Sequence, residues 1–600
     1  MTATSTATQA DSRRWASPTK ECDLIMKGGI TSGVIYPRAA CQLAETYRFR
    51  QVGGASAGAI AAAFVAAAEL GRGRPAPAGF AGLEGIADDL GTNLSTLFQP
   101  TKATKGAFGI LSAWIEPDWG TLRKVMVTVW RLLRHAPVVA VVVFGLAMTL
   151  GVAVTPALQQ NPDWRLWWMP RPSWLVWVPG SFLLAVIAAA VATAVKTSRS
   201  MTENGFGLCN GHIGTDPRHQ PLTDWMSDTL DALAGLTRKD GPLLFGHLWG
   251  ADPDDKAIDL QVMTTCLTLR RPYRFPFATD VFFACPTCMG TYFPENVVAA
   301  LFPSTGPAKQ DDADWTCPLH PAQKVRHLPP AEYLPVVVAA RISLSFPGLI
   351  SAIPLCYVDQ SRPPGKQDGV VAWFSDGGIA SNFPMHFFDR LWPRRPTFGI
   401  NLQPKDPDYP DMVWRAKTPK QGLLPRVHPV TSPAQFFRGI LDTMQNWNDT
   451  TQLSLPGFRD RVVEVRTTSV EGGMNLKMKP GTIKDLTERG QDAAKLLETF
   501  DFELHRWIRY RVAMNLLDDT LTTLDARYAP TNQDVGYQAF LADYGPRASS
   551  YKMSQHQLAA DTDATQDLMD EAATWAAADH PATAGETPNP EPALRLVPPQ

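Results

Sequence analysis

The sequence contains little cysteine and no large excess of charge. Its 8 cysteines in 600 residues form no disulfide framework, so we expect most of them to be buried, reduced thiols. Its 56 basic and 58 acidic residues leave a net charge of −2, which lacks the basic signature of a nucleic-acid-binding protein. Residues 1–19 also lack the apolar core of a signal peptide, and we expect a disordered cytoplasmic tail there.

Charge is absent altogether from two long apolar stretches, residues 136–156 and 173–195. Each is long enough to cross a bilayer core of about 30 Å as a helix. The alternative is a buried helix of a globular protein, but neither stretch shows the polar stripe of a soluble helix. We therefore predict a two-helix transmembrane hairpin within residues 121–200. Tryptophans crowd its link, as in the aromatic belt of a membrane interface: Trp164, Trp167, Trp168, Trp174 and Trp177.

The basic residues around this hairpin predict its orientation. The link carries only Arg165 and Arg171, with Asp163. Because positively charged flanks stay on the cytoplasmic side, we expect a multi-pass protein of the cell (inner) membrane whose termini and catalytic domain are cytoplasmic. The outer flanks hold most of the basic residues: Arg123, Lys124, Arg131, Arg134, Lys196 and Arg199.

A G-x-S-x-G segment, Gly54 to Gly58, follows a predicted strand over residues 47–52 and precedes an alanine-rich predicted helix over residues 59–70. This is the setting of a nucleophile elbow, in which small neighbours leave a serine hydroxyl unobstructed at a helix N-terminus. The positive end of the helix dipole favours an oxyanion there. An ordinary strand-to-helix turn is the alternative, and Ser56 is our candidate nucleophile.

Two other segments place glycine and aspartate at strand ends. The predicted strand over residues 22–26 runs into Gly28 and Gly29, whose amides can point at a ligand as an oxyanion hole requires. The predicted strand over residues 370–374 ends near Asp376, which is followed by Gly377 and Gly378. Ligands of open α/β sheets bind at the carboxyl ends of strands, where this aspartate is expected. Asn382, a little further on, is expected to cap the next helix rather than to bind substrate.

In this order, the glycine loop, the G-x-S-x-G turn and the Asp-Gly-Gly strand end resemble the patatin-like phospholipase family of serine acyl hydrolases. The resemblance covers residues 22–70 and about 330–400, including a block of small residues at 340–347. It implies a patatin-like three-layer α/β/α hydrolase fold, here a bacterial-type, membrane-anchored member. Ile30 stands where the family usually has a third loop glycine, and Ser32 where it has Arg or Lys.

The resemblance also implies an activity and the residues for it. Ser56 would be the nucleophile, Asp376 its base, and the Gly28 and Gly29 amides the oxyanion hole. The substrate would be a membrane phospholipid or a related acyl lipid, and catalysis would need no cofactor. Two alternatives remain open, namely a Ser–His–Asp triad with His386 or His428 as base, and a catalytically silent membrane scaffold of the same fold.

Four metal-ligating residues occur as two close pairs, Cys285 with Cys288 and Cys317 with His320. The spacing suits a closed tetrahedral Cys₃His zinc site that pins a loop, and we predict a structural rather than catalytic zinc. A redox pair or two incidental turns are the alternatives, because C-x-x-C alone is common.

The hairpin interrupts the predicted catalytic domain, because the elbow precedes it and Asp376 follows it. Strands are expected over residues 257–269, 397–402 and 461–467, and helices over 222–236, 483–499 and 503–524. The predicted parts are a tail at 1–19, the first catalytic part at 20–120, the hairpin at 121–200, the second catalytic part at 201–430 with a Cys-rich loop at 285–320, a C-terminal strand and helices at 431–558, and a disordered tail at 559–600.

Overall fold

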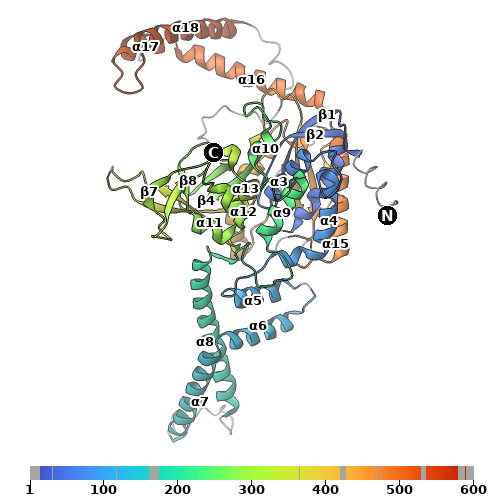
Figure 1. Ribbon diagram of the computed structural model, residues 1–600, viewed down its shortest axis with the longest axis vertical. Coiled ribbons are helices and arrows are strands. Elements are labelled where there is room, and N and C mark those ends of the chain that lie inside the picture. Colours follow the sequence, from blue (N-terminus) through green and yellow to red (C-terminus); the bar gives the residue numbers. More distant parts are fainter. Residues whose placement is uncertain are drawn as a thin grey trace.

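The structure is a computed structural model of the chain (Figure 1). It describes residues 14–29, 31–116, 118–160, 174–363, 365–407, 409–418, 427–468, 471–472, 475–528, 531, 536–578 and 588. The first thirteen residues of the predicted tail, Ile30, and three of the predicted belt tryptophans (Trp164, Trp167 and Trp168) lie outside the described residues.

The fold is built on one large mixed sheet. Its strands are β1 (Lys20–Met26), β2 (Tyr47–Ala55), β4 (Asp259–Cys266), β5 (Arg271–Phe275), β6 (Phe282–Ala284), β7 (Asp312–Thr316), β8 (Lys324–His327), β10 (Ile353–Val358), β11 (Gly369–Asp376), β12 (Thr397–Pro404), β13 (Val413–Arg415) and β14 (Val462–Thr467). Among the described residues these twelve strands have the order β13-β14-β12-β1-β2-β4-β11-β10-β6-β8-β7, with β5 also paired to β4. The strands β14, β12, β1, β2 and β4 are parallel neighbours, and the remaining pairs of this sheet are antiparallel. A separate parallel pair consists of β3 (Gly207–Cys209) and β9 (Gly348–Ile350).

The two faces of this sheet are covered unequally. In β1, Leu24 belongs to the large hydrophobic core and its neighbour Ile25 to a small second cluster, because successive side chains of a strand point to opposite faces. The small cluster contains Phe383, Met385 and Leu453. The predicted three-layer sandwich therefore has one thick helical layer and one thin layer. The thick layer contains α2 (Tyr36–Thr46), α3 (Ala57–Leu70), α4 (Gly79–Leu97), α9 (Leu222–Ala234), α13 (Val336–Ser343) and α15 (Pro480–Glu498).

The helix α3 lies at the centre of the thick layer and is buried nearly all round. Its alanines are small enough for the helix to pack directly on β1, β2 and β4. The thin layer includes the end of α14 (Pro433–Leu453), with η4 (Gly377–Ile379), η5 (Met385–Phe387) and η6 (Arg459–Arg461) nearby. The remaining short elements are η1 (Ser32–Ile35), α10 (Phe245–Trp249), α11 (Pro286–Tyr292), α12 (Glu295–Leu301), η3 (Ala331–Tyr333) and η7 (Gly545–Arg547).

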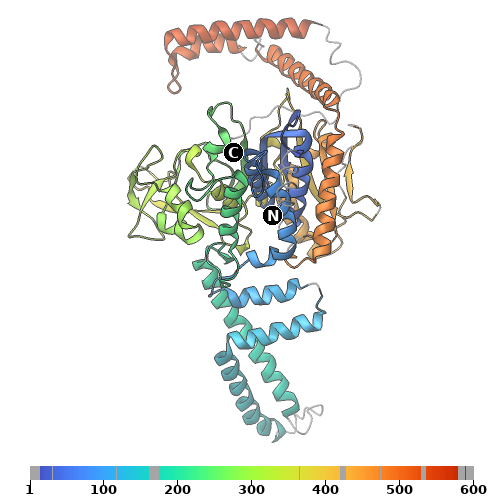
Figure 2. The same ribbon diagram turned by 45° about the vertical axis from the view of Figure 1, so that its right-hand side comes forward.

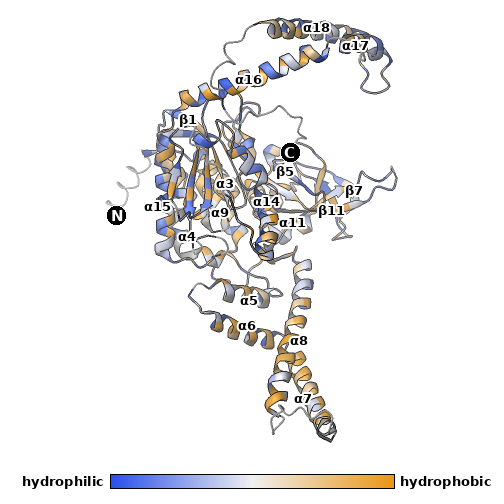
Figure 3. Ribbon diagram, turned by 180° about the vertical axis from the view of Figure 1, so that it is seen from behind, coloured by the Kyte–Doolittle hydropathy of each residue, from blue (hydrophilic) through white to orange (hydrophobic). Residues whose placement is uncertain are grey.

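Two long apolar helices, α7 (Pro137–Gln160) and α8 (Trp174–Glu203), pack against each other and project away from the sheet (Figure 1). Their apolar windows have mean hydropathies of 2.5 and 2.3, and Figure 3 shows that hydrophobic residues predominate along the two helices. Only 17% of each window is buried, so neither resembles the buried core helix that we weighed as the alternative. Both are long and apolar enough to cross a membrane. Beside α8, the helices α5 (Lys105–Ile115) and α6 (Thr121–His135) run across its direction (Figure 2).

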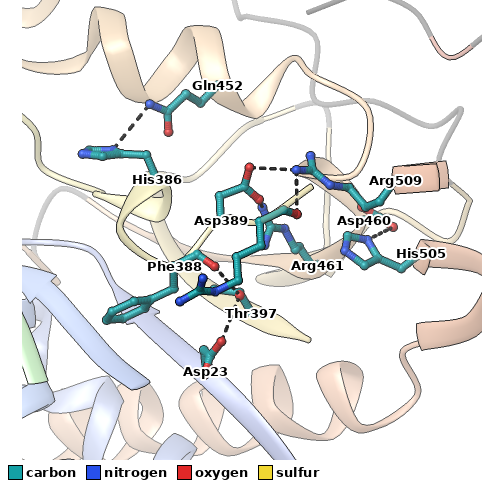
Figure 4. A network of polar contacts seen from close by, with 11 residues as sticks. Asp23, His386, Phe388, Asp389, Thr397, Gln452, Asp460, Arg461, His505 and Arg509 are labelled. Carbon is teal, nitrogen blue, oxygen red and sulfur yellow. Dashed lines mark hydrogen bonds and ion pairs between the residues drawn. The ribbon is translucent and has the colours of Figure 1, made fainter. Parts of the chain in front are cut away.

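The C-terminal helices extend from the other end of the molecule. The predicted helices over 483–499 and 503–524 correspond to α15 and to α16 (Phe502–Tyr528), and the predicted strand over 461–467 to β14. The start of α16 is held by the polar network in Figure 4. There Arg509 Nη2 donates to Asp389 Oδ2 over 2.9 Å, Arg461 donates to the other oxygen, and His505 Nδ1 lies 3.3 Å from Asp460 Oδ2.

Ordered structure reaches into the ranges of both predicted tails. Trp15 is buried, with 2% of its surface exposed, and its indole N–H donates to Cys41 O over 2.8 Å. At the other end, α17 (Gly536–Tyr544) leads to α18 (Gln555–Ala577), which packs against α16. The expected disorder from residue 559 is therefore corrected up to Ala577. The sequence could not reveal this packing, because each contact joins segments that are distant in the chain.

Candidate active site

Ser56 occupies the sharp turn between β2 and α3. Its backbone has φ 55° and ψ −128°, a region that residues other than glycine rarely occupy. The turn is closed by backbone contacts around it. A Cβ added to Gly54 would lie 2.6 Å from Gly58 O, and one added to Gly58 would lie 2.2 Å from Met26 O. Glycine is therefore required at both positions, and the predicted elbow is present.

The Ser56 hydroxyl donates directly to the carboxylate of Asp376, with 2.7 Å between Oγ and Oδ2. Only 4% of the serine and 3% of the aspartate is exposed. The strand β4 brings them together: its Met263 pairs with Ala55 of β2, and its next residue pairs with Asp376 of β11. We had predicted the position of Asp376 from the rule that ligands bind at the carboxyl ends of parallel strands. That rule does not apply here, because β11 is antiparallel to β4. Asp376 reaches the site because the ends of β2 and β11 meet at the same level of β4.

Burial raises the pKa of Asp376 to about 7, although hydrogen bonds from Ser56 and from the Gly378 amide oppose this shift. The Gly378 amide donates to Oδ1 over 2.8 Å, so each carboxylate oxygen has its own donor. A pKa near neutrality suits a general base, because the ionised form is populated and still binds a proton readily.

The small-residue block at 340–347 supports both of these residues. Ser343 Oγ accepts from the Ser56 amide over 3.0 Å and donates to Met263 O over 2.6 Å. The Asp376 amide donates to Ser345 O over 3.0 Å. The fully buried Arg341 binds Ser345 Oγ and two backbone carbonyls, which stiffens the block.

The glycine loop is arranged differently from the prediction. The Gly28 amide donates to Asn382 O over 2.8 Å, and Asn382 Nδ2 donates back to Gly28 O over 3.2 Å. A Cβ on Gly28 would lie 2.1 Å from Asn382 Oδ1. Gly28 thus anchors the loop, while no hydrogen bond of the Gly29 amide is found within the described residues. Gly29 and the Ala57 and Gly58 amides at the start of α3, for which no hydrogen bond is found among the described residues either, are the remaining candidate oxyanion donors.

Asn382 is not a helix cap, as we had expected, but a bridge between the glycine loop and α14. Asp449 of α14 accepts from Ser381 Oγ over 2.7 Å and from the Asn382 and Phe383 amides over 2.8 Å each. Only 4% of Asp449 is exposed. Sequence reasoning missed this residue, because no motif surrounds it and its partners lie more than sixty positions away.

A hollow of about 110 Å³ lies over the Ser56–Asp376 pair. It is smaller than the roughly 300 Å³ of typical small-molecule pockets, so a bulky ligand would need it to open. Of the residues lining it, Gln445 comes from α14 and none is a histidine. The outer surface of α14 carries several exposed apolar side chains: Phe436, Phe437, Ile440, Met444 and Trp447.

Neither candidate triad histidine contacts Ser56. Figure 4 shows His386 turned toward Gln452, with 3.5 Å between Nδ1 and the amide nitrogen. His428 is exposed.

The structure brings together the four predicted metal-ligating residues. The ligand atoms of Cys285, Cys288, Cys317 and His320 all lie within 4.8 Å of one another. They lie several strands away from Ser56 across the sheet.

Comparison with known proteins found a relative that is similar over most of its length. The chain is 31% identical over 604 residues to the RpoH suppressor of Rhizobium meliloti (strain 1021), and the match spans 88% of this chain and 89% of the relative. No family model matches the chain. Among solved structures, VipD from Legionella pneumophila is 12% identical with a TM-score of 0.29, covering 94% of this chain and 89% of that chain. The type III effector ExoU is 12% identical with a TM-score of 0.25, covering 93% and 72%. TM-scores of this size do not establish a shared fold.

Proposed function

This chain belongs to the same family as the RpoH suppressor of Rhizobium meliloti, and we propose that it is a serine acyl hydrolase that cleaves carboxylic esters of lipids. One observation carries the proposal: Ser56 on a strained elbow donates a 2.7 Å hydrogen bond to a buried carboxylate, without an intervening histidine. The order of glycine loop, elbow and Asp-Gly-Gly supports a patatin-like enzyme of the phospholipase A or lysophospholipase type.

In the proposed reaction, Asp376 accepts the Ser56 hydroxyl proton while Oγ attacks the ester carbonyl. The Gly29 amide and the N-terminus of α3 stabilise the oxyanion. When the intermediate collapses, the leaving alcohol takes the proton from Asp376. A water molecule then gives its proton to Asp376 and attacks the acyl-enzyme, and Ser56 recovers the proton as the fatty acid departs.

We also propose that α7 and α8 form a transmembrane hairpin, with both flanks and the catalytic domain in the cytoplasm. The support is their length, their low burial and the basic residues on the outer flanks. A hydrolase held at a bilayer in this way has phospholipid esters within reach, which is why we favour a membrane lipid over a soluble ester.

The test is lipid mass spectrometry on membranes treated with purified protein. Ser56→Ala should abolish ester hydrolysis and labelling by a fluorophosphonate, because the nucleophile is gone. Asp376→Asn should lower turnover by a factor on the order of 10² or more, as expected for a lost general base. His386→Ala and His428→Ala serve as controls and should retain most activity.

Two results would replace this proposal. If a histidine variant is as inactive as Ser56→Ala while Asp376→Asn keeps near-normal turnover, the triad is correct. If wild-type protein hydrolyses no lipid ester and takes up no fluorophosphonate, the chain is a silent scaffold.

A further inference from the structure

The four clustered metal-ligating residues come from two elements that meet at one end of the sheet. Cys285 directly precedes α11 and Cys288 lies in its first turn. Cys317 and His320 lie in the turn between β7 and β8. Backbone hydrogen bonds from Cys317 to Gln323 (2.8 Å) and from His320 to Cys317 (3.1 Å) hold this turn in shape.

Three distances within the cluster lie near the edge lengths of a zinc tetrahedron, and all the ligand atoms lie within 4.8 Å of one another. Cys288 Sγ lies 3.6 Å from Cys317 Sγ and 3.2 Å from His320 Nδ1, which in turn lies 4.0 Å from Cys285 Sγ. With Zn–S and Zn–N bonds of about 2.3 and 2.0 Å, tetrahedral ligand atoms lie roughly 3.5 to 3.8 Å apart. The Cys288 and Cys317 sulfurs are too far apart for the roughly 2.05 Å bond of a disulfide. The three thiols are buried, whereas His320 is partly exposed.

We propose that Cys285, Cys288, Cys317 and His320 bind one zinc ion, which fastens the β7–β8 hairpin to α11. This hairpin needs such a fastening, because both strands are short and β7 is the last strand of its edge of the sheet. With four protein ligands the site is closed, so the metal is structural. A further buried thiol, Cys356 on β10, interacts electrostatically with Cys317 but lies outside the cluster of four, so we assign it to the surroundings of the metal rather than to the ligand set.

The experiment is metal analysis of full-length protein purified without chelators. We expect about one zinc per chain, and its loss in both Cys285→Ser and Cys317→Ser. Cys209→Ser, a buried cysteine away from the cluster, is the matched control and should keep the metal. Cobalt added to the metal-free wild type should give the absorption of a tetrahedral thiolate site, which tests the ligands without relying on variants that fold.

Any of three results would overturn the proposed zinc site: wild-type protein without zinc, a disulfide between Cys288 and Cys317, or zinc retained by both ligand variants. Comparison of His320→Ala with Cys356→Ser identifies the fourth ligand. Loss of zinc only in Cys356→Ser would overturn the assignment of His320.

A second inference concerns a groove beside the hairpin and rests on the membrane insertion proposed above. A groove of about 540 Å³ lies between α5, α6 and α8. Ile110, Leu132, Met201 and Phe206 make its wall apolar, and the buried hydroxyl of Thr193, which lines it, has no hydrogen-bond partner within the described residues.

Four basic residues are close neighbours in the chain of residues that line this groove, namely Leu132 of α6 and Thr197 of α8. This basic cluster consists of Arg131, Arg134 and His135 of α6 and Lys196 of α8, which are close enough to interact electrostatically. Burial, and then repulsion by the three cations, lowers the pKa of His135. No ion pair of these four side chains with an acidic residue is found in the part of the chain that the structure describes, and Arg131 Nη1 is buried without a hydrogen-bond partner.

We propose that this groove holds an anionic phospholipid, with an acyl chain along the apolar wall and the phosphate at the basic cluster. The cluster neutralises a phosphate by charge complementarity. The groove continues the apolar surface of α8, and the ends of membrane helices lie at the level of lipid headgroups. The exposed apolar residues of α6, among them Leu122, Met126 and Trp130, place this helix at the same interface.

The test uses full-length protein in nanodiscs of phosphatidylcholine with added phosphatidylglycerol, followed by native mass spectrometry. We expect the wild type to retain phosphatidylglycerol, and the double variant Arg131→Gln with Lys196→Gln to retain at least tenfold less. Arg123→Gln is the matched control, because Arg123 lies on the same helix but stacks on Trp119. Excess inorganic phosphate should not displace the lipid, since it offers no acyl chain.

Equal retention of both lipids, unchanged retention by the double variant, or displacement by inorganic phosphate would overturn the lipid site alone. Protein that never enters nanodiscs would overturn the membrane proposal and this one together. The proposed ester hydrolysis is tested separately with the Ser56→Ala variant. A failure of that proposal is therefore distinguishable from a failure of the membrane proposal or of the lipid site.

Discussion

At the scale of single residues, Asp376 is the group whose environment matters most. Its carboxylate is buried beside Ser56, and its pKa of about 7 follows chiefly from that burial. The same burial that makes it a good base also makes its charged form unfavourable in the folded protein. Catalysis and stability should therefore respond to pH in opposite directions.

The first prediction concerns activity. Only ionised Asp376 accepts the Ser56 proton, so kcat/KM should rise with pH, reach half its maximum near 7, and fall about tenfold per pH unit well below that value. A pH profile from 5 to 9 with a short water-soluble ester measures this without the complication of a lipid surface. A profile that stays flat across this range would exclude Asp376 as the base.

The second prediction concerns stability. The pKa of Asp376 in the folded protein is raised above the ordinary value of about 3.9. The stability that this group contributes to the fold is therefore fully present below about pH 4 and is lost as pH rises through about 7. Asp376→Asn removes the buried charge, so it should stabilise the fold at pH 8, by an amount on the order of a few kcal/mol. Thermal unfolding at pH 8 and pH 5 should show the gain shrinking at the lower pH. A gain equal at both values would contradict this account.

At the scale of elements, one buried side chain of the helix α14 joins this helix to the segment that follows Asp376. Asp449 accepts hydrogen bonds from three consecutive residues, Ser381 to Phe383, and Asn382 in turn holds Gly28. The position of the glycine loop therefore depends on a helix that begins more than four hundred residues after it.

The third prediction is that Asp449→Asn lowers kcat by roughly tenfold or more, because displacement of a positioned group costs rate even far from the chemistry. The amide oxygen can still accept from the two backbone N–H groups, but the negative charge that strengthens all three hydrogen bonds is lost, with a stability loss of about 1 to 3 kcal/mol. Asp442→Asn changes an exposed carboxylate on the same helix and is the control. Kinetics and thermal unfolding of both variants test this, and near-normal kcat in Asp449→Asn would argue against a positioning role.

At the scale of the whole molecule, a sheet-based body carries two projections. The apolar hairpin leaves it at one end, and α16 to α18 leave it at the other (Figure 1). The hairpin helices contact each other and α6. An insertion that packs mainly on itself can be added to a fold without disturbing the core.

The fourth prediction follows from this separation. A reporter placed within residues 160–170 should lie outside the cytoplasm, and reporters at either terminus should lie inside. Replacing residues 136–195 by a short linker should release a soluble protein that still hydrolyses a water-soluble ester, because no residue of the catalytic hollow is removed. Full-length protein that stays soluble after lysis without detergent would contradict the membrane hairpin.

Much of this molecule follows from local sequence. A sharp turn is predictable from Gly54, Ser56 and Gly58, because only small residues tolerate it. The two hairpin helices are predictable from their apolar stretches, because a helix of membrane length needs an unbroken apolar run. The Cys and His pairs were recognisable from spacing alone. In each case the residues that matter are neighbours in the chain.

The tertiary structure decided which distant segments contact each other. Asp376 meets Ser56 through an antiparallel strand that we had not expected, Gly28 donates to Asn382 rather than pointing into the hollow, and Asp449 completes that network from α14. Tertiary packing likewise buries Trp15, and Met569 and Ala572 of α18, in segments where we had expected disorder. Local sequence determines which conformations a segment favours, whereas the partner of a buried polar group depends on how the whole chain packs, and so only the folded structure reveals it.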